Sequence, residues 1–185
     1  MNEVLSTIAA RRSHRAYEQT QLTQEQIDIL LKAGMDSPSA VNRQPWHFTV
    51  VQNQDLLREI NKAVWEETMK ATPENRSARF NDPAFDVFYH APTVIFISCD
   101  RENYWGQLDS GIACQNICLA AESLGLGTVI LGMPRAAFQN EKGSDFRKAL
   151  LFPETHDFAI AVAVGTPTDD KPAHLHAKDR ISYVR

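Results

Sequence analysis

The 185-residue sequence predicts a single α/β (α+β) domain, and two kinds of apolar pattern carry this prediction. Several long segments have apolar residues at helical spacing, whereas residues 93–99 and 158–164 are nearly continuous apolar runs of strand length. Such runs are typical of strands that are buried on both faces. The composition, 43% hydrophobic and 23% charged, is ordinary for a globular protein, and no repeat or linker divides the chain.

Two helices and a loop are expected before the first strand. Apolar residues fall on one side of a short helix over residues 2–10. Residues 24–35 follow the same periodicity, and Thr23 with Gln26 has the spacing of a capping box at the start of this helix. Prolines, serines and an asparagine make residues 37–45 a loop.

The middle of the chain alternates between strands and helices. Residues 46–52 form a β-type run, and residues 54–70 return to helical spacing. Residues 71–83 are polar and interrupted by prolines, so this segment is expected to be mobile and to be a candidate lid. After the buried strand over residues 93–99, a long and mostly apolar helix is expected over residues 108–124, with Gly125 as its C-terminal stop.

The last third of the chain is expected to add short elements around the second buried strand, residues 158–164. Residues 128–132 form a short strand, and residues 145–151 form a short helix that ends before Pro153. The tail from Asp169 is polar until residues 181–184, which are expected to form an edge strand.

Several classes of protein and site are disfavoured by the sequence. No apolar run approaches the roughly 20 residues of a membrane helix, and the N-terminal basic residues follow the apolar ones, the reverse of a secretory signal. We therefore expect a cytoplasmic protein that does not act at membranes. The three cysteines argue against a disulfide framework, and Cys114 and Cys118 are expected in the core. His174 and His176 have no third ligand nearby and are expected in a solvated loop.

The strongest cluster of polar residues is the segment RRSHR. The sequence contains no P-loop, dinucleotide fingerprint, nucleophile elbow or HExxH motif. Its net charge is −4, yet Arg11, Arg12 and Arg15 lie together beside Ser13. On residue type alone, this segment is a solvated basic turn, a site for a phosphate-bearing small ligand, or a nucleic-acid contact. A net-acidic domain lacks the extended basic face that duplex binding needs, which argues against the third alternative.

Two further segments bear polar groups on a constrained or extended backbone. Residues 38–46 combine small residues with Asn42 and Gln44 in a proline-fixed loop, which suits hydrogen bonding to a flat heterocycle. The same loop can also be a plain connection between a helix and a strand, with Trp46 in the core. Lys178 and Arg180 alternate in an extended tail and fall on one face; taken alone they are a surface charge pair.

Four segments, in this order, resemble the nitroreductase family of FMN-dependent oxidoreductases: RRSHR, PSAVNRQPWHF, GLGTVILG and AKDRISYV. The resemblance covers nearly the whole chain, and the first two segments are the more specific. It implies one domain over residues 1–185 with a central, mostly antiparallel sheet flanked by helices. It also implies a homodimer with FMN at its interface and a C-terminal segment that extends to the partner.

The resemblance also assigns cofactor contacts by position. Arg11 and Arg12 would serve the phosphate and ribityl end of FMN, and Ser13 would contact the cofactor beside them. Arg15 would reach the pyrimidine edge of the flavin, where a cation stabilises negative charge on the reduced ring.

Further contacts implied by the resemblance come from the tail, the partner and the segment that passes the flavin ring. Lys178 and Arg180 match a C-terminal phosphate clamp. The loop over residues 38–46 would come from the partner subunit and would contact FMN through Pro38, Ser39 and Ala40. Asn42 would either order this loop or touch the flavin. The ring segment consists of Ile130, Leu131, Gly132 and Met133. Some family members have a glutamate in that segment, and its absence here implies ring recognition by backbone groups.

The resemblance implies that FMN carries the chemistry and that no side chain acts as an acid or a base. NADH or NADPH would deliver a hydride to flavin N5, and a small-molecule acceptor such as a nitroaromatic or a quinone would then take its place, in a ping-pong scheme. The alternatives are a dehalogenase or flavin-fragmenting enzyme on the same fold, and a non-catalytic FMN-binding protein. Nucleic acid is not an expected partner.

Overall fold

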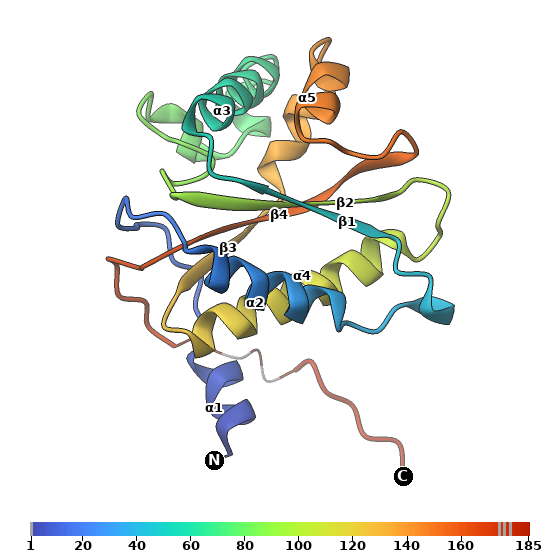
Figure 1. The fold of residues 1–185 in the computed structure, drawn as a ribbon. Helices are drawn as coiled ribbons and strands as arrows, with labels where there is room; N and C mark the ends of the chain where they lie inside the picture. The colour runs from blue at the N-terminus through green and yellow to red at the C-terminus, as the bar shows by residue number, and fades with distance from the viewer. Residues whose placement is uncertain (1, 174, 176, 178) are drawn as a thin grey trace.

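The computed structural model describes residues 2–173, 175, 177 and 179–185, which contain one sheet of four strands in the order β1-β2-β4-β3 (Figure 1). The strands are β1 (Trp46–Val51), β2 (Thr93–Asp100), β3 (Gly127–Leu131) and β4 (His156–Gly165). Every neighbouring pair is antiparallel. The predicted α+β class with a central antiparallel sheet is therefore confirmed.

The central position of β2 explains the continuous apolar run in the sequence. This strand pairs with β1 on one side and with β4 on the other. Ile95 and Ile97 pack on one face of the sheet, whereas Val94 and Phe96 pack on the other, and all four side chains are fully buried. Because both faces are covered, alternate side chains are apolar on either side of the strand.

Helices cover both faces of the sheet (Figure 1). Helices α2 (Gln24–Met35) and α4 (Gly106–Ser123) lie on one face, and α3 (Gln54–Thr68) and α5 (Gly143–Ala149) lie on the other. No helix in the described part of the chain is both long enough and apolar enough to cross a membrane.

The ends of α2 and α4 follow the sequence signals. Thr23 Oγ1 accepts a hydrogen bond from Gln26 N at 3.3 Å, and Gln26 Oε1 accepts one from Thr23 N at 2.9 Å, which completes the predicted capping box. After α4, Gly125 adopts a φ of +72°, and the Leu126 N–H donates to the Ala121 carbonyl at 2.9 Å. This Schellman-type end turns the chain directly into β3.

The candidate lid, residues 71–83 between α3 and β2, is attached to the core through Phe80. It contains two short helices, η2 (Pro73–Asn75) and η3 (Ala78–Asn81). Phe80 is only 4% exposed and packs edge-to-face against Trp65, with ring centroids 4.9 Å apart. The segment is therefore anchored by an aromatic contact, and its role as a lid stays a prediction.

Both ends of the chain lie away from the sheet (Figure 1). Helix α1 (Glu3–Ala10) has no buried residue, and its apolar side chains face solvent. Residues 181–184 form no strand in the described tail, and Ile181 is 69% exposed. The edge-strand prediction is wrong because the end of the tail lies below α4, on the side of this helix away from the sheet (Figure 1).

Replacing Gly125 with alanine is expected to lower the free energy of unfolding by about 1 kcal/mol, because a Cβ disfavours left-handed backbone. Nothing lies within 4 Å of the added Cβ, so no steric clash contributes. Gly125→Asn is the matched control, since asparagine tolerates this conformation better, and it should be clearly less destabilising. Urea denaturation measures both, and equal losses would contradict the backbone explanation.

Candidate functional site

The basic segment, residues 11–15, lies beside the start of β3. Ser13 forms a parallel bridge with Thr128, and the His14 N–H donates to the Thr128 carbonyl at 2.9 Å. Arg11, Arg12 and Ser13 are partly buried, whereas Arg15 is exposed. The sheet edge therefore fixes the backbone from which the three guanidiniums extend.

These guanidiniums are not neutralised by nearby acids. Among the described residues, no carboxylate oxygen lies within 4 Å of a side-chain nitrogen of Arg11, Arg12 or Arg15. Arg12 Nη1 donates to the carbonyls of Ala9 and Arg11 at 2.6 and 2.8 Å, whereas Arg12 Nε is buried and has no hydrogen-bond partner in the described chain. Clustered positive charge with a free buried donor is what an anion site requires.

The exposed Arg15 is oriented by its neighbours. Its Nη1 donates to the Ser13 carbonyl at 3.3 Å, and its guanidinium carbon lies 5.8 Å from the centre of the Tyr89 ring. A cation above an aromatic face is weakly attracted to it, which limits the directions in which the side chain points.

Asp169 ties the segment after β4 to the basic segment. Its Oδ1 lies 2.7 Å from His14 Nδ1, and its Oδ2 accepts hydrogen bonds from Arg15 N and Lys171 Nζ, both at 2.9 Å. Burial raises the pKa of Asp169, but the bonds from Lys171, Arg15 and His14 outweigh this effect and lower the pKa to about 2. The carboxylate is therefore charged at neutral pH and holds the backbone of the basic segment in place.

Backbone pairing extends this attachment. The Glu18 N–H donates to the Thr166 carbonyl at 2.9 Å, and the Thr168 N–H donates to the Ala16 carbonyl at 3.0 Å. Between them, the Tyr17 hydroxyl donates to the His14 carbonyl at 2.7 Å, and burial raises the pKa of this phenol well above its ordinary value. The C-terminal tail thus leaves the body of the protein next to the basic segment.

The loop between α2 and β1 has a strained backbone. Its short helix η1 (Ala40–Asn42) and the residues after it include three positive φ angles, 52° at Val41, 54° at Asn42 and 47° at Gln44. Left-handed backbone at residues other than glycine costs on the order of 1–3 kcal/mol each, and it persists only when the surroundings fix it. Strain of this kind concentrates at functional sites, which makes the loop a candidate binding element.

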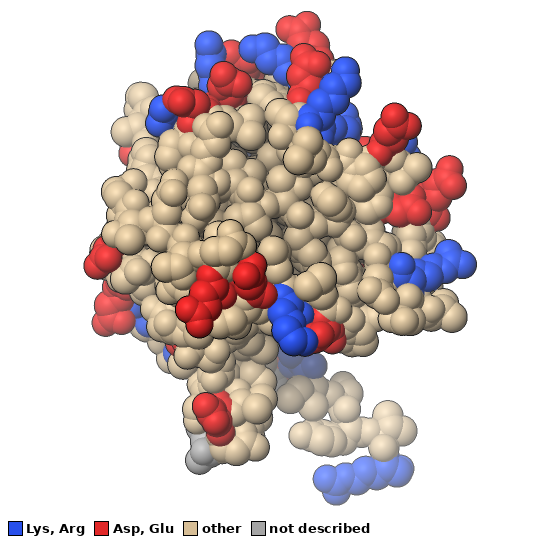
Figure 2. Space-filling model, viewed as in Figure 1, with Lys and Arg blue, Asp and Glu red and all other residues tan. Residues whose placement is uncertain are grey.

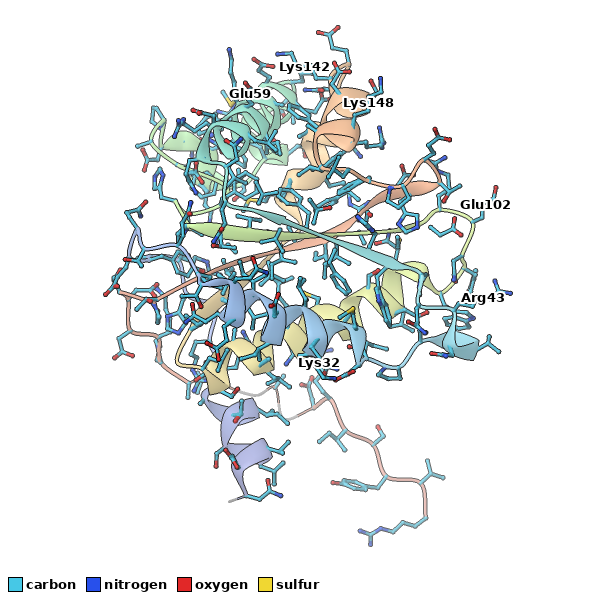
Figure 3. All side chains as sticks on the ribbon, in the orientation of Figure 1. Lys32, Arg43, Glu59, Glu102, Lys142 and Lys148 are labelled. Carbon is cyan, nitrogen blue, oxygen red and sulfur yellow. The ribbon has the colours of Figure 1, made fainter. Side chains whose placement is uncertain are left out.

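Side chains within the loop hold this shape. Ser39 Oγ accepts a hydrogen bond from Gln44 N at 2.9 Å, and Asn42 Oδ1 accepts one from Gln44 Nε2 at 3.2 Å. Asn42 therefore helps to order the loop. Arg43 points outward into solvent (Figure 3), and Pro38 is exposed.

The basic segment and the strained loop lie at opposite ends of α4. The Ala40 N–H donates to both carboxylate oxygens of Asp109, at 3.3 and 3.2 Å, in the first turn of that helix. Ser13, in contrast, pairs with Thr128, just after the helix ends. The axial rise from Asp109 to the last residue of α4 is about 20 Å, so the two elements attach to well-separated points of one chain.

The predicted ring segment presents two of its four residues to the outside. Ile130 is 41% exposed, and nothing lies within 4 Å of a Cβ built on Gly132. Leu131 is 2% exposed, and Met133 packs against the core at the start of η4 (Met133–Phe138). Leu131 can therefore offer a ligand only its backbone groups.

The structure describes one of the two residues of the predicted C-terminal clamp. Lys178 lies outside the described residues. Arg180 is exposed, and its Nε lies 3.7 Å from Oδ1 of the adjacent Asp179. In the described part of the chain, this is the one ion pair that Arg180 forms.

The three cysteines are buried, as predicted for Cys114 and Cys118. All three, Cys99, Cys114 and Cys118, are free thiols. A hydrogen bond with Cys118 and burial raise the pKa of the Cys114 thiol. No group of three metal-binding side chains occurs in the ranges that the structure describes, and His174 and His176 lie outside them.

Two acids in this region were missed by the sequence reasoning. Asp109 is an acid on the buried face of a mostly apolar helix. Its position in the sequence could have marked it as functional, because a buried carboxylate needs a specific partner. Asp169 sits in a polar tail with other acids and bases, and nothing local marks it. Its role depends on contacts with residues 154 and 155 positions away.

Comparisons with known proteins agree with these features. Residues 8–166 match the profile of the Nitroreductase family. An Archaeoglobus fulgidus protein named "Putative NADH dehydrogenase/NAD(P)H nitroreductase" is 34% identical over 186 residues, covering 100% of this chain and 97% of the relative. The crystal structure of a nitroreductase with bound FMN from Desulfitobacterium hafniense has a TM-score of 0.94 and 33% identity, with both chains fully covered. An iodotyrosine deiodinase of Thermotoga neapolitana is 25% identical, covering 94% of this chain and 93% of the relative.

Replacing Asp169 with asparagine is expected to destabilise the protein at neutral pH and to matter progressively less in acid. The folded-state pKa of about 2 lies below the ordinary value of 3.8, so the carboxylate stabilises the folded state above pH 4. That stabilisation is lost as the pH falls towards 2. Urea denaturation of the wild type and Asp169→Asn at pH 6 and pH 3 measures the effect.

Asp170→Asn is the matched control, because Asp170 is exposed and forms no ion pair in the described chain. It should follow the wild type at both pH values. A stability difference between the wild type and Asp169→Asn that is the same at pH 6 and pH 3 would contradict the assigned contacts.

Proposed function

Because the chain belongs to the nitroreductase family, we propose that it is an FMN-dependent NAD(P)H oxidoreductase that reduces small aromatic acceptors. The observation that carries this proposal is the cluster of three arginines, none paired with a carboxylate in the described structure. The cluster lies where the family resemblance puts the cofactor. A flavin phosphate is a dianion, and planar guanidiniums bind such oxygens in pairs.

One buried atom tests whether the residues fit this cofactor. Arg12 Nε is buried without a partner, although Arg12 Nη1 is occupied by the carbonyls of Ala9 and Arg11. An anionic oxygen at this position would satisfy the free donor. Arg11, Arg12 and Ser13 would therefore hold the phosphate and ribityl end of FMN.

Arg15 would hold the other end of the cofactor, at the pyrimidine edge of the ring. A guanidinium stays charged at physiological pH, and a fixed positive charge there stabilises the negative charge of a reduced flavin. Ile130 and Gly132 would line the ring, with backbone groups in place of the glutamate that some family members have.

Bound FMN would supply the redox chemistry, taking a hydride at N5 from NADH or NADPH and giving electrons to a nitroaromatic or a quinone in a separate half-reaction. The chain itself would bind the cofactor, fix charge beside its ring and leave one face open to two flat molecules in turn. No side chain is assigned as a general acid or base.

The proposed site requires a homodimer. Within one chain, the basic segment and the loop with Pro38, Ser39 and Ala40 are separated by the length of α4. A second copy, related by a two-fold axis, would place its loop beside the first copy's basic segment. Each flavin would then contact both subunits.

Exposed apolar side chains at the ends of the chain also support a second copy. Val4 and Ile8 of α1 are 64% and 49% exposed, and Val4 borders an apolar groove of about 420 Å³ between α1, α2 and α4. Ile181 and Val184 of the tail are 69% and 100% exposed. Covering such surface is favourable by roughly 25 cal/mol per Å². The tail would carry Lys178 and Arg180 towards the partner.

Nucleic acid is not part of the proposal. Figure 2 shows basic and acidic side chains intermixed over α3 and α5, and charges are sparse over the middle of this face. This face therefore lacks the continuous basic surface that duplex binding needs.

A dehalogenase is the second candidate, because a relative named iodotyrosine deiodinase matches nearly the full length of the chain. It differs from the main proposal in the acceptor. Steady-state assays with NADH or NADPH, with a quinone and with a halogenated tyrosine as acceptors, separate the two.

The purified protein is expected to be yellow and to bleach on anaerobic addition of NADH or NADPH, because bound FMN would be reduced. Visible absorption before and after mixing measures this, and the rate with each nucleotide identifies the donor. A flavin band that does not bleach would identify a non-catalytic FMN-binding protein. A protein without bound flavin, and with no affinity for added FMN, would contradict the proposal.

The double variant Arg11→Ala, Arg180→Ala is expected to purify nearly colourless. Each hydrogen bond to a charged group contributes about 1.5 kcal/mol or more, so losing two weakens FMN binding by about 100-fold or more. Flavin fluorescence titration measures the Kd.

Arg58→Ala combined with Arg79→Ala removes the same charge from two exposed arginines and is the matched control. It should retain FMN. Wild-type FMN content in the Arg11 and Arg180 variant would show that the phosphate assignment is wrong.

A further inference from the structure

Asp109 is a buried carboxylate whose two oxygens share one hydrogen-bond donor. Its residue exposure is 3%, and both of its oxygens accept the one N–H of Ala40, at 3.3 and 3.2 Å. No lysine, arginine or histidine nitrogen lies within 4 Å of it in the described structure. Burying a charge is unfavourable unless hydrogen bonds and local dipoles compensate, and its place in the first turn of α4 supplies part of that compensation.

The Ala40 N–H that Asp109 binds lies immediately before the strained residues of the loop. Ala40 directly precedes Val41 and Asn42, whose φ angles are 52° and 54°. Neither residue is glycine, so the loop returns to ordinary backbone angles unless it is held at its ends. One end is fixed by Ser39 Oγ, which accepts from Gln44 N at 2.9 Å. Two side-chain bonds tie the loop to α4: Asn116 Nδ2 donates to Ser37 Oγ at 2.8 Å before the strained residues, and Asp109 accepts from Ala40 N directly beside them.

We propose that Asp109 is a positioning residue of the flavin site: it anchors the η1 loop to α4 in the shape in which Ser39 and Ala40 meet the FMN bound by the partner subunit. This inference rests on the proposed function. It adds a residue that touches neither the cofactor nor the acceptor and that acts through the backbone of Ala40. The carboxylate is suited to the task because a charged acceptor binds an N–H more strongly than a neutral one.

A purely structural role for Asp109 makes a different prediction from a positioning role. A structural residue would change stability and leave the bound flavin unaltered. A positioning residue changes the surroundings of the flavin ring while the phosphate end, held by Arg11 and Arg12, keeps the cofactor bound. The visible circular dichroism of bound FMN reports on ring surroundings and separates the two roles.

The experiment compares Asp109→Ala and Asp109→Asn in the FMN-loaded full-length protein. Asp109→Ala is expected to keep bound FMN, to change its visible circular dichroism, and to raise the KM for a quinone acceptor about tenfold with a smaller change in kcat. Asp109→Asn keeps one carbonyl oxygen that can accept from Ala40 N, and it should restore much of the wild-type signal and KM.

Asp145→Ala is the matched control, because Asp145 is also an acid in the first turn of a helix, α5, on the other face of the sheet. It should leave the flavin spectrum and the KM unchanged. The double variant Asp109→Ala, Val41→Gly tests the part played by strain. Glycine adopts positive φ freely, so the double variant should recover part of the acceptor KM lost in Asp109→Ala.

The inference is overturned if Asp109→Ala has the wild-type flavin spectrum and acceptor KM. If that variant does not fold, Asp109→Leu decides, because leucine is of similar size and cannot accept a hydrogen bond: folded protein with the wild-type flavin spectrum and acceptor KM would overturn the inference. Failure of the proposed function itself is recognised separately, because the wild-type protein would then bind no FMN or show no bleaching with NADH or NADPH.

Discussion

Positive charge without a compensating carboxylate is the constraint on which the rest of the site depends. Three guanidiniums within five residues repel one another, and a protein would ordinarily neutralise them with nearby acids. Here Asp169 contacts the basic segment, but its carboxylate binds the His14 side chain and the Arg15 backbone N–H and not a guanidinium. The guanidiniums remain available, so an anion that binds them also stabilises the folded chain. In the proposed complex, FMN binding would therefore also stabilise the folded chain through this segment.

Helix α4 separates the two elements of the proposed site within one chain. Its first turn holds the η1 loop through Asp109, and its C-terminal end leads through Gly125 into the strand that supports the basic segment. Along the axis of α4, the points to which these two elements attach are about 20 Å apart. In the proposed homodimer, two-fold symmetry would bring the loop of one copy to the basic segment of the other without any change in the fold of either chain.

The sequence was most informative where the determinants are local. Capping residues, buried strands and the Gly125 stop were predicted because each depends on neighbours a few positions apart. The arginine cluster was also visible, because its residues are adjacent. The salt bridge of Asp169 was not, because its partner is 155 residues away. The edge strand over residues 181–184 was predicted from its apolar residues alone, and strand formation also requires a free neighbouring edge.

The residues of the η1 loop fit a role that needs one fixed shape. Glycines at positions 41, 42 and 44 would remove the cost of left-handed backbone, but they would also give the unbound loop many more conformations. Val41, Asn42 and Gln44 restrict those alternatives, and the bonds to Ser39 Oγ and Asp109 then select a single strained one. A loop built this way presents the same surface before and after a ligand arrives, so little binding free energy is lost in ordering it. In the proposed reaction, a loop of fixed shape would present the same geometry to the nicotinamide and to the acceptor in turn.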